Sequence, residues 1–390
     1  MDYHSIWGGQ SIIMRLVMKI LYDARYVPID GKFDGIGRFT QGLAYGLSRV
    51  PEIDMTLLIY DERQLEQLPK SNHLIVNNFM DVVQERQTLP KILNQQECDA
   101  VFSPFFTIGT KGRQYPLVLT IHDMIYFSHR TPPLNLSQVQ KLGWRLFHMS
   151  YAPARLILNN ADAIATVSNT AKNELREAKL TKRKIFVTHN GAEPKPILES
   201  NHAASNSILY NGSFVPYKNV ECVVKAMAHL PELTLDLMSR ITPDRRRDLE
   251  KIARNGGFLD RIVFHNGVSD QEYLALLKNT RCLVTASKIE GFGLPVIEAQ
   301  QQGVPVVCSD IPIFHEIAAH SAHYFDPDSP MALAAQVKKL ANQEVSKEYI
   351  RRGIKNAKRF TWDNTAIEAL KAIKEAQKSF NARHAKGSTR

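Results

Sequence analysis

Two carboxylates eight positions apart enclose a glycine-rich loop in the segment EGFGLPVIEA, residues 290–299. The run CLVTAS before it has the apolar, β-branched pattern of a buried strand, and the residues after Pro295 follow a helical period. Proline is favoured at the first position of a helix, because no hydrogen bond is lost there. The segment is therefore predicted to turn from a strand into a helix, at the strand end where parallel sheets bind ligands.

The residue types in this loop suit a ligand with an anionic centre and hydroxyl groups on both sides. Amides at the start of a helix attract phosphate, whereas Glu290 and Glu298 would repel it and are suited to accept hydrogen bonds from hydroxyls. We expect Glu298 to bind a ribose and Glu290 a second sugar. The alternative, two ordinary surface carboxylates, leaves the glycines unexplained. The other expected contacts in this loop are Gly291, Phe292, Gly293 and Leu294.

Short β-branched runs alternate with segments of helical period along almost the whole chain. Alternation of this kind predicts an α/β fold with doubly wound parallel sheets. A chain of 390 residues exceeds one hydrophobic core, so two Rossmann-like domains are expected. The predicted strands are RLVMKILYDA, MTLLIY, HLIVNN, AVFSPF, PLVLTIHD, AIATVS, KIFVTHN, SILYNGS, LTLDLMS, RIVFHNG, CLVTAS, PVVCSD and HYFD.

The boundary between the domains is predicted within residues 192–207, a stretch with two prolines, small polar residues and little periodicity. We assign residues 1–195 to the first domain and residues 205–360 to the second. A last helix over residues 361–380 is expected to cross back onto the first domain. Residues 1–17 are interpreted as an upstream extension and residues 381–390 as a frayed basic tail.

The charge of the chain favours anionic partners. Its formal net charge is +10, and the interval from Met124 to Ala161 contains basic and aromatic residues but no acidic one. This interval predicts either a solvated helix face or a surface that contacts an acidic membrane. No apolar run is long enough to span a bilayer, and no signal peptide is found. Four cysteines without metal or redox spacing indicate reduced thiols in a cytoplasmic protein: Cys98, Cys222, Cys282 and Cys308.

EGFGLPVIEA resembles the signature of the family 4 glycosyltransferases, and three other segments match that family in order. These are DGIGRFTQGLAYGL at residues 34–47, LTIHDMIYF at residues 119–127 and YNGSFVPYKN at residues 210–219. The likeness covers essentially the chain from Met18 to Phe380. It implies the GT-B fold, in which an acceptor domain and a nucleotide-sugar donor domain face each other across a cleft.

The resemblance also implies roles for individual residues. Lys218 corresponds to the lysine that neutralises the diphosphate leaving group, and Ser213 stands where many members carry arginine. His122 is expected to contact the transferred sugar, and Asp123 to position it or act on the acceptor side. Asn219 is expected to cap the following helix. Further donor contacts are expected at Gly35, Gly37, Arg38 and Gly212, with Gly267 and Val268 lining the base pocket.

Resemblance further implies a retaining hexosyltransferase that needs no cofactor or metal. A pair at Asp326 and Asp328 has the spacing of a metal site, but the surrounding YFDPDSPMALA is typical of a strand, a turn and a helix cap at Asp328 or Ser329. The donor is expected to be a GDP-sugar that carries mannose or a related hexose. The acceptor is expected to be a glycan or lipid-diphosphate-linked glycan in surface polysaccharide synthesis, at the inner face of the membrane.

Three other functions remain open from the sequence. An epimerase of the same fold would act on a sugar nucleotide without an acceptor. A non-catalytic partner protein would keep the two domains without turnover, although Lys218 and Glu290 are both retained. The basic charge also permits nucleic-acid binding, but no recognised motif supports it.

Overall fold

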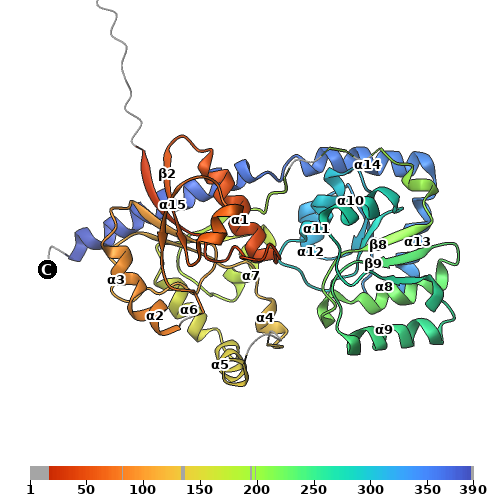
Figure 1. The fold of residues 1–390 in the computed structure, drawn as a ribbon, viewed down its shortest axis with the longest axis horizontal. Helices are drawn as coiled ribbons and strands as arrows, with labels where there is room; N and C mark the ends of the chain where they lie inside the picture. Colours follow the sequence, from red (N-terminus) through yellow and green to blue (C-terminus); the bar gives the residue numbers. More distant parts are fainter. Residues whose placement is uncertain (1–16, 81, 133–136, 194–195, 198, 388–390) are drawn as a thin grey trace, which may run out of the picture.

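The computed structural model describes residues 17–80, 82–132, 137–193, 196–197 and 199–387. Two lobes lie side by side, each an open sheet with helices on both faces (Figure 1). The first sheet has the strand order β3-β2-β1-β4-β5-β6-β7. Its strands are β1 (Met18–Asp23), β2 (Ile53–Ile59), β3 (Asn72–Ile75), β4 (Ala100–Ser103), β5 (Leu117–Thr120), β6 (Ala163–Thr166) and β7 (Ile185–Val187).

The second sheet has the order β10-β9-β8-β11-β12-β13, and every pairing in both sheets is parallel. All thirteen predicted strands and the doubly wound fold class are confirmed. In each sheet the order reverses beside the first strand, between β1 and β4 and between β8 and β11, where ligands bind in such sheets. The second set comprises β8 (Ser207–Tyr210), β9 (Thr234–Leu237), β10 (Ile262–Phe264), β11 (Leu283–Thr285), β12 (Val306–Ser309) and β13 (His323–Phe325).

Helices connect the strands and cover both faces of each sheet. Those of the first lobe are α1 (Gly35–Ser48), α2 (Val82–Gln87), α3 (Leu89–Asn94), α4 (Ile125–Ser128), α5 (Gln138–His148), α6 (Ala152–Asn159) and α7 (Asn169–Glu177). Those of the second are α8 (Val220–Ala226), α9 (Pro243–Asn255), α10 (Asp270–Asn279), α11 (Leu294–Gln301), α12 (Pro312–Ala318), α13 (Pro330–Lys339) and α14 (Gln343–Ala357).

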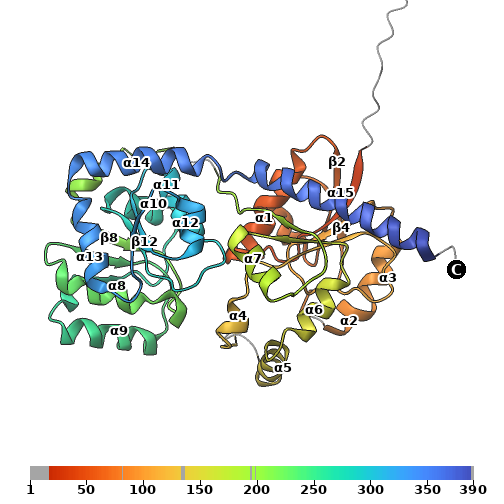
Figure 2. The same ribbon diagram turned by 180° about the vertical axis from the view of Figure 1, so that it is seen from behind.

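A last helix, α15 (Trp362–Gly387), leaves the second lobe and lies along the first sheet (Figures 1 and 2). Its first residue packs so closely on α1 that a Cβ at Gly42 or Gly46 would collide with Trp362. The helix continues past the predicted end at residue 380, and the expectation of a frayed tail from residue 381 is wrong as far as Gly387. Arg383 explains this, because it pairs with the buried carboxylate of Asp162.

Two sequence expectations fall partly outside the described residues. Of the upstream extension at residues 1–17, only Val17 is described. Within the boundary segment at residues 192–207, positions 194, 195 and 198 are not described, and the described part holds one short 3-10 helix, His202–Ala204. The first sheet ends at residue 187 and the second begins at residue 207.

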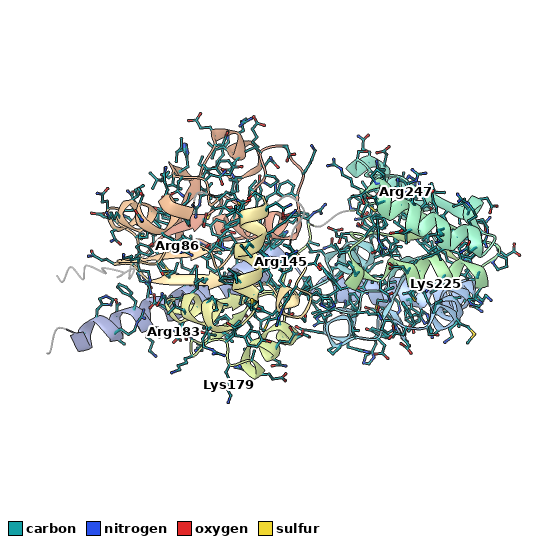
Figure 3. The ribbon with its side chains drawn as sticks, turned by 90° about the horizontal axis from the view of Figure 1, so that it is seen from below. Arg86, Arg145, Lys179, Arg183, Lys225 and Arg247 are labelled. Carbon is teal, nitrogen blue, oxygen red and sulfur yellow. The ribbon has the colours of Figure 1, made fainter. Side chains whose placement is uncertain are left out.

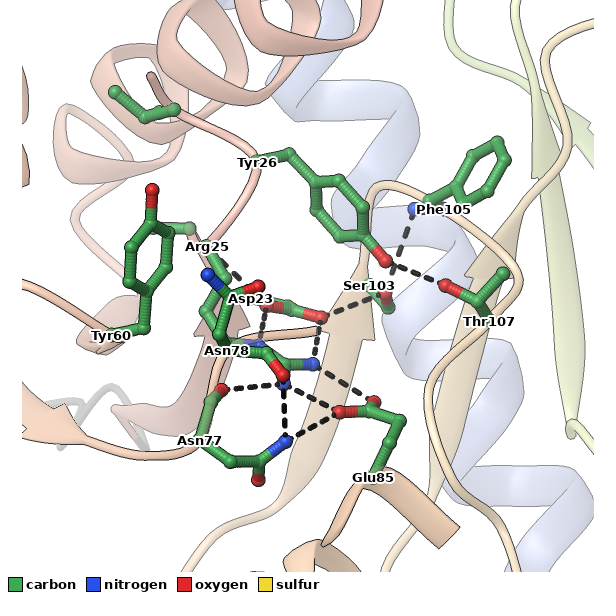
Figure 4. Close-up of polar contacts among 12 residues, drawn as sticks. Asp23, Arg25, Tyr26, Tyr60, Asn77, Asn78, Glu85, Ser103, Phe105 and Thr107 are labelled. Carbon is green, nitrogen blue, oxygen red and sulfur yellow. Dashed lines mark hydrogen bonds and ion pairs between the residues drawn. The ribbon is translucent and has the colours of Figure 1, made fainter. Parts of the chain in front are cut away.

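A buried ion network holds the loops at the carboxyl edge of the first sheet (Figure 4). Arg25, fully buried, donates to Asp23 at 2.7 and 2.9 Å and to Glu85 at 2.7 and 3.1 Å. It also donates to the carbonyl of Asn77 at 3.2 Å, and Ser103 donates to Asp23 at 3.1 Å. One guanidinium therefore joins the end of β1, the segment after β3 and helix α2, and Asp23 connects this cluster to the end of β4.

We predict that Arg25→Met destabilises the first lobe strongly. Removing one partner of a buried ion cluster leaves unpaired buried carboxylates, which costs about 3–5 kcal/mol of unfolding free energy. Urea unfolding followed by fluorescence measures the change. Arg63→Met is the matched control, because Arg63 forms an exposed ion pair with Asp61. Equal stability of the Arg25 and Arg63 variants would contradict the proposed importance of the network.

Candidate active site

The carboxyl edges of the two sheets meet, and residues predicted from separate motifs come together between them. Arg38, on α1 of the first lobe, pairs with Glu298 on α11 of the second at 2.8 Å. Ser168 donates to the carbonyl of Gly291 at 3.1 Å. Asp123 lies against the same glycine, since a Cβ built on Gly291 would be 2.8 Å from its Oδ2.

Glu290 is held by two donors of its own lobe. Lys218 Nζ lies 2.5 Å from Glu290 Oε1, and Ser287 Oγ donates to the same oxygen at 2.8 Å. The Glu290 side chain is only 10% exposed, so these two donors replace most of the water that would otherwise solvate the carboxylate. A cation and a hydrogen-bond acceptor therefore stand side by side at the end of β11.

Glu298 lies one turn into α11, as the sequence predicted. It accepts from Arg38 and, at 3.3 Å, from the hydroxyl of Tyr273. Arg38 was expected to contact the donor, and in this structure it is paired with Glu298. Pro295 is the second residue of the helix rather than the first.

The glycines of the loop are required by its geometry. Gly293 has φ of +99°, a left-handed conformation that disfavours other residues, and a Cβ there would lie 2.8 Å from the ring of Phe314. At Gly291 a side chain would displace Asp123. The side chain of Phe292 is buried beside His189, so this residue offers the site its backbone alone. Leu294 is partly buried and packs on the core.

His122 and Asp123 follow β5 and differ in their protonation chemistry. The Nε2 atom of His122 lies 2.8 Å from the carbonyl oxygen of Pro104, which can only accept, so Nε2 carries the proton and Nδ1 is left as an acceptor. Burial lowers the pKa of His122, which favours the neutral ring. Burial raises the pKa of Asp123 to about 6, the amide of Ile125 acts against this, and Glu290 adds to the rise.

The glycine loop before α1 contains a residue that the sequence analysis missed. Asp34 is the N-cap and accepts from the amide of Gly37 at 2.8 Å, so a carboxylate already occupies part of this helix end. The signal was present, because aspartate is a favoured cap. A Cβ at Gly35 would meet no atom within 4 Å, so that position borders open space.

In the loop after β8, the prediction that Asn219 caps the following helix is wrong. Asn219 precedes α8 but makes no capping bond, because its backbone is left-handed and its side chain donates to the carbonyls of Ala286 and Pro327. Gly212 packs on Tyr210, whose hydroxyl donates to the carbonyl of the exposed Ser213 at 3.0 Å.

Gly267 and Val268 lie between β10 and α10. The amide of Gly267 donates to Met238 at 2.8 Å, and a Cβ there would be 2.9 Å from the side chain of Arg240, which the sequence analysis did not single out. Val268 is partly buried and packs on the core. Their assignment to a base pocket stays a prediction.

The aspartates with metal-like spacing have other partners. Asp328 pairs with Lys288, and Asp326 accepts from the amide of Asp328 at 2.9 Å. Ser329 is the cap of α13 and accepts from Ala332 at 3.1 Å, which confirms the predicted turn and helix start.

Comparison with known proteins agrees with this geometry. The profile described as Glycosyltransferase Family 4 matches residues 33–195, and that described as Glycosyl transferases group 1 matches residues 199–360. The chain belongs to the group 1 glycosyltransferases of family 4. O-antigen chain mannosyltransferase B of Escherichia coli is 26% identical over 387 residues, covering 92% of this chain and 100% of that protein.

Solved glycosyltransferase structures share the arrangement of the two sheets. Sucrose-phosphate synthase from Thermosynechococcus elongatus has a TM-score of 0.72 and 18% identity, over 91% of this chain and 98% of its own. HepE of Anabaena, in complex with UDP and glucose, has a TM-score of 0.69 and 17% identity, over 92% of this chain and 99% of its own. This glycosyltransferase therefore has the GT-B fold. Among its described helices, none is long and apolar enough to cross a membrane.

We predict that Asp123→Asn changes how thermal stability depends on pH. The folded-state pKa of about 6 lies above the ordinary value of 3.8, so the folded protein holds an extra proton between these values and loses stability as the pH rises through 6. The asparagine variant lacks this loss, and its Tm relative to wild type should rise between about pH 4 and pH 7. Melting curves across this range test it, with Asp248→Asn on α9 as control. A pH-independent difference would refute the prediction.

Proposed function

We propose that the protein transfers a hexose, with mannose from GDP-mannose as the best-supported donor, to a hydroxyl of a glycan or lipid-linked acceptor with retention of configuration. The observation that carries the proposal is the grouping of Lys218, Glu290 and Glu298 around one glycine loop of the second lobe, with Asp123 of the first lobe against that loop. A sugar, a diphosphate and a nucleoside require such a sequence of acceptors and cations.

In this mechanism the second lobe holds the donor and the first presents the acceptor. Glu298 accepts the ribose hydroxyls and exchanges its contact with Arg38 for them. Lys218 and the loop amides bind the diphosphate, and Glu290 orients the transferred sugar. Preorganised donors of this kind stabilise the negative charge that develops on a leaving group.

Retention follows if the departing phosphate takes the proton of the acceptor. The acceptor oxygen bonds to the anomeric carbon on the face that the diphosphate leaves, the bond from that carbon to the phosphate oxygen breaks, and the proton passes to that oxygen. Glu290 is engaged by Lys218 and Ser287, which supports a binding role for it rather than nucleophilic attack. Lys218 and Arg38 supply positive charge, and we propose that no divalent ion is needed.

The donor assignment draws on similarity as well as chemistry. A relative that matches nearly the whole chain is named an O-antigen chain mannosyltransferase, which favours mannose and surface polysaccharide synthesis. HepE binds UDP and glucose, so a uridine donor is the competing choice. An epimerase would release no nucleoside diphosphate in response to an acceptor, and a non-catalytic partner protein would release none at all.

We also propose that the first lobe contacts an acidic membrane surface through α5 and α6. Exposed apolar residues follow α5 and its C-cap: Val139, Leu142, Leu146 and the C-cap Met149 are 82%, 59%, 59% and 62% exposed. Their spacing places them on one face of the helix. In Figures 1 and 2, α5 projects from the first lobe, away from its sheet. An exposed apolar stripe of this kind is typical of helices that lie in a membrane interface.

Positive charge surrounds this stripe. Lys141 and Arg145 lie on α5, and Figure 3 shows Arg145 on the same lobe as Lys179 and Arg183. On α6, the side chain of Leu156 is 68% exposed. A hollow of about 460 Å³ is lined by Ala152, Arg155, Leu156, Asn159, Lys182 and Arg183. Apolar side chains among unneutralised cations complement an anionic bilayer, where acyl chains lie below phosphate groups.

Donor binding provides the direct test of the proposed function. GDP should raise the Tm of the wild-type protein more than UDP, ADP or dTDP do, because a ligand stabilises the state that binds it. Glu298→Gln should weaken GDP binding by about 2 kcal/mol, since hydrogen bonds to a charged acceptor are lost. Glu232→Gln, at the opposite end of the second sheet, is the control. No stabilisation by any nucleoside diphosphate would contradict the proposal.

Membrane contact predicts selective flotation with vesicles. Wild-type protein should float with vesicles that contain phosphatidylglycerol and should be released by high salt, which screens the charges. Leu142→Ser with Leu146→Ser, and separately Lys141→Glu with Arg145→Glu, should remain unbound. Arg247→Glu with Arg254→Glu, on α9 of the second lobe, serves as the matched charge control. Equal flotation of all variants would exclude this surface.

A further inference from the structure

Aromatic rings form a row along the carboxyl edge of the first sheet. Tyr26 stacks on Phe79 with ring centroids 4.5 Å apart, and it meets the edge of Phe105 at 5.7 Å. These three residues follow β1, β3 and β4, and each is only partly buried. We call Tyr26, Phe79 and Phe105 the aromatic row. Each residue therefore keeps some exposed surface at the ligand-binding edge, and Phe105 also packs against the hydrophobic core.

The row is continuous with the candidate active site. The ring centroid of Phe105 lies 6.5 Å from that of His122, which precedes Asp123 at the end of β5. At the other side, the carbonyl oxygen of Tyr26 would lie 3.2 Å from a Cβ at Gly37, in the first turn of α1. The rings therefore begin beside the residues that face the glycine loop of the second lobe.

The buried ion network fixes the three rings. Tyr26 directly follows Arg25, and its hydroxyl lies 2.8 Å from the hydroxyl of Thr107. Phe79 comes two residues after Asn77, which is bonded to both Arg25 and Glu85. Figure 4 shows Tyr26 and Phe105 above this network. Rings held in this way are preorganised, so little entropy is lost when a ligand stacks on them.

Phe105 is connected to the ion network through Ser103. Ser103 Oγ accepts from the amide of Phe105 at 3.5 Å and donates to Asp23 at 3.1 Å. The Arg25 guanidinium thus bonds Asp23 of β1 and the segment after β3 directly, and Asp23 connects it to Ser103 at the end of β4. Each of the segments after β1, β3 and β4 carries one ring of the row. We infer that Arg25 positions the segments that carry the three rings.

We propose that the aromatic row is the acceptor subsite and binds a pyranose ring by stacking. The apolar face of a pyranose presents polarised C–H groups, which are attracted to the negative face of an aromatic ring. The row belongs to the first lobe, opposite the loop assigned to the donor. This inference rests on the proposed function, because it names the group that receives the transferred sugar.

The test compares acceptor and donor kinetics in ring variants. Wild-type protein is assayed with GDP-mannose and a panel of octyl glycosides of mannose, glucose, galactose and N-acetylglucosamine. With the best acceptor, Phe79→Ala and Phe105→Ala should each raise the acceptor KM about tenfold, several times more than any change in the donor KM. Phe79→Tyr, which keeps the ring, should restore the acceptor KM.

The control is Tyr45→Ala, a partly exposed tyrosine near the end of α1 that belongs to neither site. It should leave both KM values unchanged, and Tm values identify any variant that loses its fold. Acceptor KM values that match wild type in both ring variants would overturn the subsite while leaving the transferase function intact. A wild-type enzyme that releases GDP but accepts no glycoside would also overturn it. Absence of any GDP release would instead refute the proposed function.

Discussion

The site depends on two sheet edges being held against each other, and a single carboxylate of the second lobe makes much of that contact. Glu316 on α12 accepts from the amides of Asn169 and Thr170 at 2.7 and 2.8 Å, at the start of α7 in the first lobe. It also bonds the hydroxyl of Thr170 and His189. Burial alone would raise the pKa of Glu316, but these bonds lower it to about 2. The carboxylate acts as a helix cap supplied by the other lobe.

At the candidate active site, each carboxylate of the glycine loop is paired with a cation. Each glutamate of the glycine loop already has a cationic partner, Lys218 for Glu290 and Arg38 for Glu298. A partly desolvated carboxylate without a partner would be costly. Because Arg38 comes from the first lobe, the pair also links α1 to α11. A ligand that replaces Arg38 at Glu298 must therefore compete with a contact between the lobes, which couples donor binding to the relative position of the two sheets.

The first lobe contains a buried ion network, the aromatic row and the exposed apolar stripe of α5. Its interior contains the fully buried Arg25, whose loss would leave Asp23 and Glu85 without their cation, and we interpret its role as fixing the position of these segments. Above it stand the rings of the aromatic row, and further along the chain α5 presents its apolar stripe to the surroundings. In the proposed function these features serve one molecule, a glycan carried on a lipid. The second lobe needs no comparable surface, because its nucleotide-sugar ligand is soluble.

The sequence by itself determined the thirteen strands, their parallel arrangement and the position of the glycine loop after β11, because period and turn chemistry depend on neighbouring residues. It also indicated which residues follow strand ends. Only the tertiary structure decided that Arg38 pairs with Glu298 across 260 positions and that Arg25 bonds Glu85 across 60. It also decided that the side chain of Asn219 turns away from its helix. Such contacts join residues far apart in the chain. Their partners are selected by burial and desolvation, which no local pattern encodes.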